Sequence, residues 1–247
     1  MTSASRRMLA RDPSEPHRVA SSLELLYDLC FVVAIAQAAA ALHHEIGHGH
    51  AAHGALAFGV TFCAIWWAWM GFAWFASAFE TDDAVYRLKV LVQMCGVLVF
   101  AAGVRPMFQG TDFTLGTLGY AIMRIGLVGQ WLRAARSVPA MRRTATRYAT
   151  GIVLLQLCWI GALWLPTDRW LLAFFTLIPF ELLVPAWAER AGRTPWHPHH
   201  IAERYGLLTI IVLGESVLAA TLAVQSAAEL GAAWPSLLPV IVAGPVI

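Results

Sequence analysis

Five ionisable side chains lie inside long apolar stretches of this sequence: Glu24, Asp28, Arg124, Glu181 and Glu215. A charge at the centre of a bilayer costs about 2.5–3.5 kcal/mol on insertion scales, so such groups pair, line water or bind a ligand. Asp28, Glu181 and Glu215 lie deep in their stretches, and Arg124 is the deep basic residue. We therefore expect these three carboxylates to form a site for a small cation or polar solute, with Arg124 as counter-charge.

Glu24 and Asp28 are four residues apart and so share one face of the first expected helix. Two carboxylates on one face repel each other, and we expect one of them to be paired or protonated. Glu24 lies near the start of its apolar stretch, so a position in interfacial water is an open alternative for it. Asp28 lies deeper and is expected to face a polar interior.

Arg124 has two interpretations that the sequence leaves open. As a structural residue, it would neutralise Asp28, Glu181 or Glu215 in a buried tie between helices. As a functional residue, it would belong to a pathway for ions or protons.

Glu181 lies between Pro179 and Pro185. A proline inside a helix removes a backbone donor and clashes with the preceding turn, so a kink or a break is expected on each side of Glu181. Broken helices of this kind bind ions in transporters. The alternative is a kinked packing helix whose glutamate pairs with Arg124.

Histidines cluster between the first two apolar stretches. Residues 44–48 read His-Glu-Ile-Gly-His, which formally matches the H-E-x-x-H pattern of zinc proteases. We reject a protease because Gly47 weakens the required helix and no third ligand follows from the spacing. A polar loop is the simplest interpretation, with weak transition-metal binding by His44, His48 and His50 as the alternative. The histidines at 197–200 are assigned no metal, and no cofactor motif is present.

Long apolar runs must position these residues. A bilayer core about 30 Å thick needs about 20 helical residues. The sequence predicts seven full spans and an eighth, at about 23–42, 54–79, 88–104, 115–132, 148–165, 170–188, 205–224 and 235–247. The last run reaches only about 21 Å at about 1.5 Å per residue, so we expect it to be incomplete. The predicted fold is an all-α transmembrane bundle over 23–247, preceded by a polar cytoplasmic tail over 1–22.

The composition excludes two classes of protein. Charged residues make up 13% of the chain and apolar residues 59%, whereas a soluble domain is roughly 25% charged. So few charges cannot cover a water-soluble fold. The net charge of +2 also excludes a nucleic-acid-binding protein that depends on bulk basicity. The cysteines stand apart in apolar runs, which indicates buried thiols at Cys30, Cys63, Cys95 and Cys158.

Basic residues are distributed very unequally between the two sides of the predicted bundle. Of the 17 lysines and arginines, 14 lie in the N-terminal tail and the second, fourth and sixth connections. Arg105 and Arg169 lie on the opposite side, and Arg124 lies within a span. Because cytoplasmic loops are enriched in lysine and arginine, the N-terminus is expected in the cytoplasm.

Two segments carry a specific pattern. Residues 23–37 read LELLYDLCFVVAIAQ, and residues 200–216 read HIAERYGLLTIIVLGES. They resemble the motifs L-E-L-F-[FY]-D-L-V-F-V and H-x-x-E-R-[FY]-G-L-x-x-I-I-x-L-G-E-S of the bacterial low temperature requirement A (LtrA) membrane proteins. The departures are small, with Leu26 in place of an aromatic residue and Cys30 in place of a valine.

The resemblance implies a multi-pass protein of the bacterial inner membrane, and members of the family are usually longer. It implies no substrate or reaction, and it leaves the oligomeric state open. By their match to the motifs, the positions expected to matter are Glu24, Asp28, Glu203, Arg204, Glu215 and Ser216.

Three functions remain open at this stage. The leading hypothesis is a channel or secondary transporter for a small cation or polar solute. A membrane-embedded enzyme that acts on a lipid-type substrate with a carboxylate base is the first alternative. A noncatalytic, stress-related membrane component is the second.

Overall fold

A computed structural model describes residues 6–12, 14–15, 19–79 and 81–229. The described residues form helices and no strand, which confirms the all-α prediction. The predicted eighth span, 235–247, lies outside the described residues. The helices are α1 (Ser22–Gly47), α2 (Ala51–Ala78), α3 (Ala84–Phe108), α4 (Thr114–Ser137), α5 (Arg142–Ala162), α6 (Trp170–Glu189) and α7 (Pro198–Glu229), with single 3₁₀ turns at Pro139–Met141 and Thr167–Arg169.

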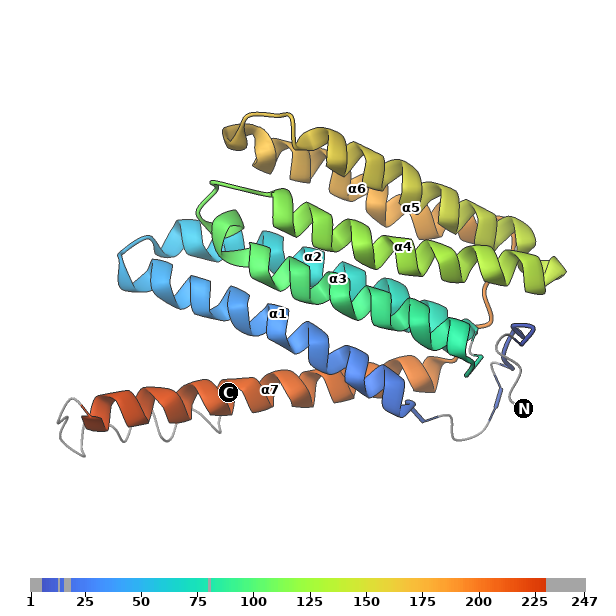
Figure 1. Ribbon diagram of the computed structural model, residues 1–247, viewed down its shortest axis with the longest axis horizontal. Coiled ribbons are helices and arrows are strands. Elements are labelled where there is room, and N and C mark those ends of the chain that lie inside the picture. The colour runs from blue at the N-terminus through green and yellow to red at the C-terminus, as the bar shows by residue number, and fades with distance from the viewer. Residues whose placement is uncertain (1–5, 13, 16–18, 80, 230–247) are drawn as a thin grey trace.

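The long helices lie side by side and alternate in direction (Figure 1). The odd-numbered helices all begin at the end of the bundle where the described N-terminal segment lies, which we call the N-terminal end; the opposite end is the far end. Successive helices α3 to α6 pack on each other, and α1 packs on α2, α3 and α7. Helix α7 therefore borders α1, on the side of the bundle away from α5 and α6.

Among the described residues, four helical stretches rather than seven are long and apolar enough to cross a membrane. They are α1, α2, α3 and the stretch Thr167–Glu189, which includes α6. The predicted seven full spans are corrected accordingly. In α4 the apolar character is diluted by polar residues buried inside the bundle, among them Arg124, Gln130 and Arg133.

Helix boundaries differ from the predicted runs where polar residues continue a helix. The predicted arginine-rich connection 133–147 is mostly helical, because α4 continues to Ser137 and α5 begins at Arg142. Helix α5 ends at Ala162, short of the predicted 165, and α1 continues five residues past 42 into the histidine cluster. Helix α6 is continuous through Pro179 and Pro185, so the predicted break is absent there.

Helix α7 begins at Pro198, seven residues before the predicted start of its span. Proline suits the first turn of a helix because its missing N–H would have no partner there, and its fixed φ fits the helix. The early start places His200, Glu203 and Arg204 in the first two turns of α7 rather than in a connection. Because α7 begins at Pro198, His200 and Arg204 are fixed on a helix that packs against α1.

The predicted polar tail is partly packed on the bundle. The backbone N–H of Arg6 donates to Asp83 Oδ2 at 2.7 Å, and the Arg6 carbonyl accepts from Arg133 Nη2 at 2.6 Å. Met8 is completely buried in the core, and the Arg11 N–H donates to the carbonyl of Ala78 at 3.0 Å. Residues 6–11 thus lie across the N-terminal end of the bundle.

The cysteines are free, but not all are buried as predicted. Cys30 and Cys63 are half-buried, whereas Cys95 and Cys158 are exposed. Apolar surroundings in the sequence do not separate a residue that faces the protein core from one on the outer surface of the bundle.

Candidate functional site

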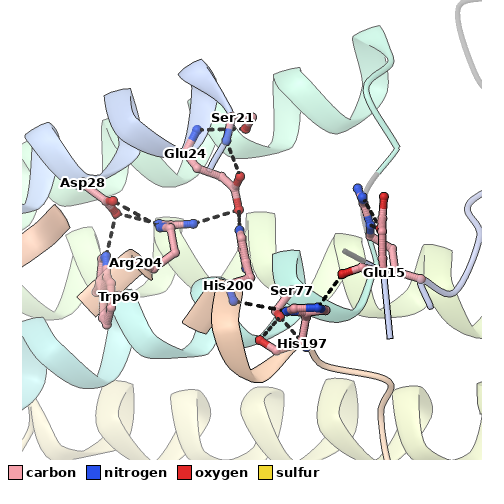
Figure 2. A network of polar contacts seen from close by, with 10 residues as sticks. Glu15, Ser21, Glu24, Asp28, Trp69, Ser77, His197, His200 and Arg204 are labelled. Carbon is pink, nitrogen blue, oxygen red and sulfur yellow. Dashed lines mark hydrogen bonds and ion pairs between the residues drawn. The ribbon is translucent and has the colours of Figure 1, made fainter. Parts of the chain in front are cut away.

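A buried polar network, here called the first network, joins α1, α2 and α7 (Figure 2). Arg204 forms a two-point contact with Asp28, with Nη2–Oδ1 at 2.6 Å and Nε–Oδ2 at 3.1 Å. Trp69 of α2 donates its indole N–H to the same Asp28 Oδ1 at 2.6 Å. Both charged side chains are 0% exposed. Because the pair is fully removed from solvent and bidentate, it fixes the relative position of α1 and α7.

Glu24 extends this network toward the N-terminal end. Its Oε1 accepts from Arg204 Nη1 at 2.9 Å and lies 3.2 Å from His200 Nε2. Its Oε2 accepts from the Ser21 backbone N–H at 2.8 Å, and Ser21 Oγ in turn accepts from the Glu24 N–H, which makes a capping box at the start of α1. Glu24 is buried, so its side chain does not reach water as the interfacial alternative required.

Beyond His200 the network reaches α2 and the N-terminal segment. The His200 N–H donates to His197 Nδ1 at 3.2 Å, and His197 Nε2 lies 2.8 Å from the Glu15 carbonyl. The His197 N–H donates to Ser77 Oγ at 2.9 Å. These contacts connect the start of α7 to the end of α2 and to the N-terminal segment.

The second buried network joins α2, α4, α5 and α6. Arg124 Nη2 donates to Glu181 Oε1 at 2.6 Å, and both side chains are more than nine-tenths buried. Trp159 donates its indole N–H to the same oxygen at 2.8 Å, and Trp67 donates to Glu181 Oε2 at 3.3 Å. The Arg124 guanidinium also lies 4.6 Å from the centre of the Tyr120 ring. Three helices therefore supply donors to one carboxylate on α6.

Two cavities meet at this second network. The outer cavity, about 240 Å³, opens among the far-end connections, where His53, Gly110 and Asp168 line it. The inner cavity, about 570 Å³, reaches the N-terminal end, where Glu189, Arg193, Thr194 and Trp196 line it. The lining residues that the two cavities share are Trp67, Tyr120 and Glu181.

The first network lines neither cavity. Glu24, Asp28, His200 and Arg204 are absent from both linings and are at most 2% exposed. Their hydrogen bonds are made to each other, to the side chains of Trp69 and His197, and to Ser21. The arrangement can therefore hold helices together, whereas the Arg124–Glu181 pair lies where a solute could reach it.

The predicted single site of Asp28, Glu181 and Glu215 around Arg124 does not form. Asp28 is bound to Arg204 and Glu181 to Arg124, in separate networks. Glu215 is half-buried on α7 and makes no hydrogen bond or ion pair with the described residues. The sequence spacing could not show this, because it gives the depth of a residue but not the helix that it faces.

The remaining motif positions lie on α7. Ser216 donates to the Val212 carbonyl of its own helix at 3.3 Å. Glu203 has one oxygen, Oε2, that is buried without a hydrogen-bond partner in the described part of the chain. The roles that the resemblance implies for Glu203, Glu215 and Ser216 stay predictions.

The histidines of the first connection do not form a loop throughout. His44 lies within α1, and its ring stacks on that of His48 with centroids 4.2 Å apart. His48 Nδ1 lies 2.8 Å from the His44 carbonyl, and His50 Nδ1 lies 3.5 Å from Glu45 Oε2. Within the described ranges, no group of three or more His, Cys, Asp or Glu side chains is placed to hold a metal ion.

Trp69 and His200 belong to the first network but were not among its expected residues. Trp69 was not singled out in the sequence, and the histidines at 197–200 were assigned no role. The available signal was the second motif, because His200 is its first residue and lies one helical turn before Arg204.

The described chain is an all-α bundle in which four helical stretches are long and apolar enough to cross a membrane. A family model, the bacterial low temperature requirement A protein (LtrA), matches residues 19–247. The chain belongs to this family. It is also 30% identical over 209 residues to an uncharacterized protein of Rhizobium meliloti (strain 1021), an alignment that covers 81% of this chain and 50% of that protein.

The chain therefore spans half the length of this curated relative. No solved structure matches it. The two motif segments of the family are the ones that meet in the first network, through Glu24 and Asp28 on α1 and His200 and Arg204 on α7.

Proposed function

We propose that this protein is a transporter that moves a small cation or polar solute across the membrane between α2, α4, α5 and α6. The observation that carries the proposal is the position of Glu181. It lines both cavities, one of which opens at the far end and the other at the N-terminal end. A buried ion pair between two cavities is the arrangement expected where a path is closed at its middle.

A secondary transporter fits this arrangement better than an open channel. Glu181 lines both cavities and is bound there by Arg124 and by Trp67. Intramembrane ionisable residues that face a bundle interior mark substrate or ion pathways in membrane proteins. Opening would require Glu181 to exchange its contact with Arg124 for a contact with the solute.

We further propose that the bundle is a multi-pass domain of the bacterial inner membrane with its N-terminal end in the cytoplasm. Arg87, Arg133, Arg143 and Arg193 lie at helix ends or turns of the N-terminal end. At the far end the corresponding basic residues are Arg105 and Arg169. An excess of lysine and arginine on one side favours the cytoplasm for that side.

The proposal is tested by solute flux into proteoliposomes that contain the whole chain. The panel comprises rubidium, choline, glycerol and an uncharged amino acid amide. We expect wild-type protein to raise flux of at least one solute above protein-free vesicles, and Glu181→Gln to lower that flux at least about tenfold. Glu45→Gln is the matched control, because Glu45 is a carboxylate of α1 that lines neither cavity.

Two results would overturn the proposal. One is wild-type flux no faster than that of protein-free vesicles for every solute of the panel. The other is equal flux in Glu181→Gln and Glu45→Gln, with both variants folded as judged by thermal denaturation in detergent.

A further inference from the structure

Several aromatic rings line the outer cavity, among them Trp67, Trp159, Trp170, Phe113 and Phe174. These rings are ordered by contact with each other: Phe113 and Trp170 stack with centroids 4.1 Å apart, and Trp159 lies 6.0 Å from Trp170 and 6.1 Å from Phe174. Their positions are therefore set before any ligand binds.

The charged residues of the outer lining are both acidic. Asp168 is exposed in the turn before α6, at the mouth of the cavity, and Glu181 lies deeper in it. Arg124 and Arg193 line the inner cavity and are absent from the outer lining. A solute that enters from the far end thus meets the carboxylates and aromatic rings of the outer cavity before it meets Arg124 or Arg193.

Glu181 keeps room for a further partner. Its Oε1 already accepts from Arg124 and Trp159, whereas Oε2 accepts from Trp67 at the longer distance of 3.3 Å. A carboxylate has about four acceptor positions. The cavity therefore offers a partly satisfied anionic oxygen next to indole rings.

Aromatic walls with a carboxylate select a particular kind of cation. An inorganic ion would lose its water against apolar rings without a set of oxygen ligands to replace it. A quaternary ammonium group is weakly hydrated and is attracted to the faces of tryptophan, tyrosine and phenylalanine, most strongly to tryptophan. A cavity of about 240 Å³ fits a small headgroup of this kind.

We propose that the outer cavity binds organic cations of the quaternary ammonium class, through the rings of Trp67, Trp159 and Trp170 and the carboxylates of Asp168 and Glu181. This inference rests on the proposed function and names the solute class of the same path. In this scheme the three tryptophan rings recognise the cation, and the Arg124–Glu181 ion pair closes the path between the two cavities.

The test compares two probes of the same shape. Choline and its neutral isostere 3,3-dimethylbutan-1-ol are titrated into the whole purified chain by calorimetry, in a maltoside detergent that carries no ammonium headgroup. We expect choline to bind at least about tenfold more tightly than the isostere. Equal binding of both probes, or no binding of choline, would overturn the inference.

Variants at the mouth and wall of the cavity locate the binding. Trp170→Leu is expected to weaken choline binding about threefold or more, since a cation–π contact contributes about 0.5–2 kcal/mol. Asp168→Asn is expected to weaken it to a similar degree, because it removes a carboxylate that faces the cation. Asp112→Asn is the matched control, because Asp112 is an exposed acid of another far-end connection and lines neither cavity. Equal weakening by Asp112→Asn and Asp168→Asn would overturn the assignment to this cavity.

The two proposals fail in different ways. If the flux of another solute depends on Glu181 but choline binds no more tightly than the isostere, the quaternary ammonium inference is wrong and the proposed transport function stands. If choline binds specifically but no solute of the panel crosses the membrane, the binding site stands and the proposed transport function is wrong.

Discussion

Arg204 and Asp28 are 176 residues apart in the sequence and are joined at 2.6 Å in the interior of the bundle. Each lies in one of the two motif segments by which the chain resembles its family. The contact ties the start of α7 to α1, and Trp69 holds the same carboxylate from α2. The two motif segments, which are far apart in the sequence, thus meet in one buried ion pair.

Removal of the Arg204 charge is expected to destabilise the fold. Arg204→Met leaves Glu24 and Asp28 buried on one face without their cation, and loss of one partner of a buried pair costs about 3–5 kcal/mol. Thermal denaturation in detergent should show a markedly lower midpoint. The double variant Asp28→Leu with Arg204→Met should recover part of the loss, because it buries fewer unpaired charges. An unchanged midpoint in Arg204→Met would contradict a structural role for this network.

Arg124 and Glu181 should behave as one unit in transport. Arg124→Met and Glu181→Gln each break the same contact, so their combined effect on flux should be close to that of either alone. The measurement is a double-mutant cycle of initial flux rates in proteoliposomes, with protein amounts matched. Multiplicative losses, as for independent sites, would contradict the assignment of both residues to one closing contact.

The sequence was sufficient for the helices and the depth of the charges, but not for their partners. The apolar runs located all the long helices, and the prediction that Asp28 is paired in the interior is confirmed. Its partner was missed because Arg204 was counted with a polar connection, whereas α7 begins at Pro198. Glu181 was one of three carboxylates considered for Arg124, and helical periodicity cannot choose among helices that are distant in sequence. The positions of the cavities depend on which helices pack together around Glu181, so the sequence could not predict them.

Asp83 should make stability depend on acid pH. The Arg133 guanidinium, together with backbone N–H groups of Arg6 and Tyr86, holds the pKa of the Asp83 carboxyl below its usual range. A lowered pKa in the folded state means that the contribution is fully present above the unfolded value of about 3.9 and is lost as pH falls toward the folded value.

The difference in melting temperature between wild type and Asp83→Asn should therefore be constant from about pH 5 to 8 and should shrink below about pH 4. The neighbouring Asp82→Asn is the control, because the Asp82–Arg87 pair is exposed and such pairs contribute about 0–1 kcal/mol. If the difference in melting temperature between wild type and Asp83→Asn instead grew as the pH fell, the assigned role of the Asp83–Arg133 pair would be wrong.

The close approach of α3 and α4 gives the last prediction. A Cβ at Gly119 would lie 2.3 Å from the backbone nitrogen of Phe100, and one at Gly96 would lie 2.6 Å from that of Met123, so no side chain fits without separation of the helices. Gly119→Ala is expected to lower the melting temperature by several degrees in detergent. Gly59→Ala is the matched control in α2, because nothing lies within 4 Å of its added Cβ. There alanine should be neutral or stabilising, since it restricts the unfolded chain and favours a helix. Equal effects of the two substitutions would mean that α3 and α4 are not in backbone contact at Gly119.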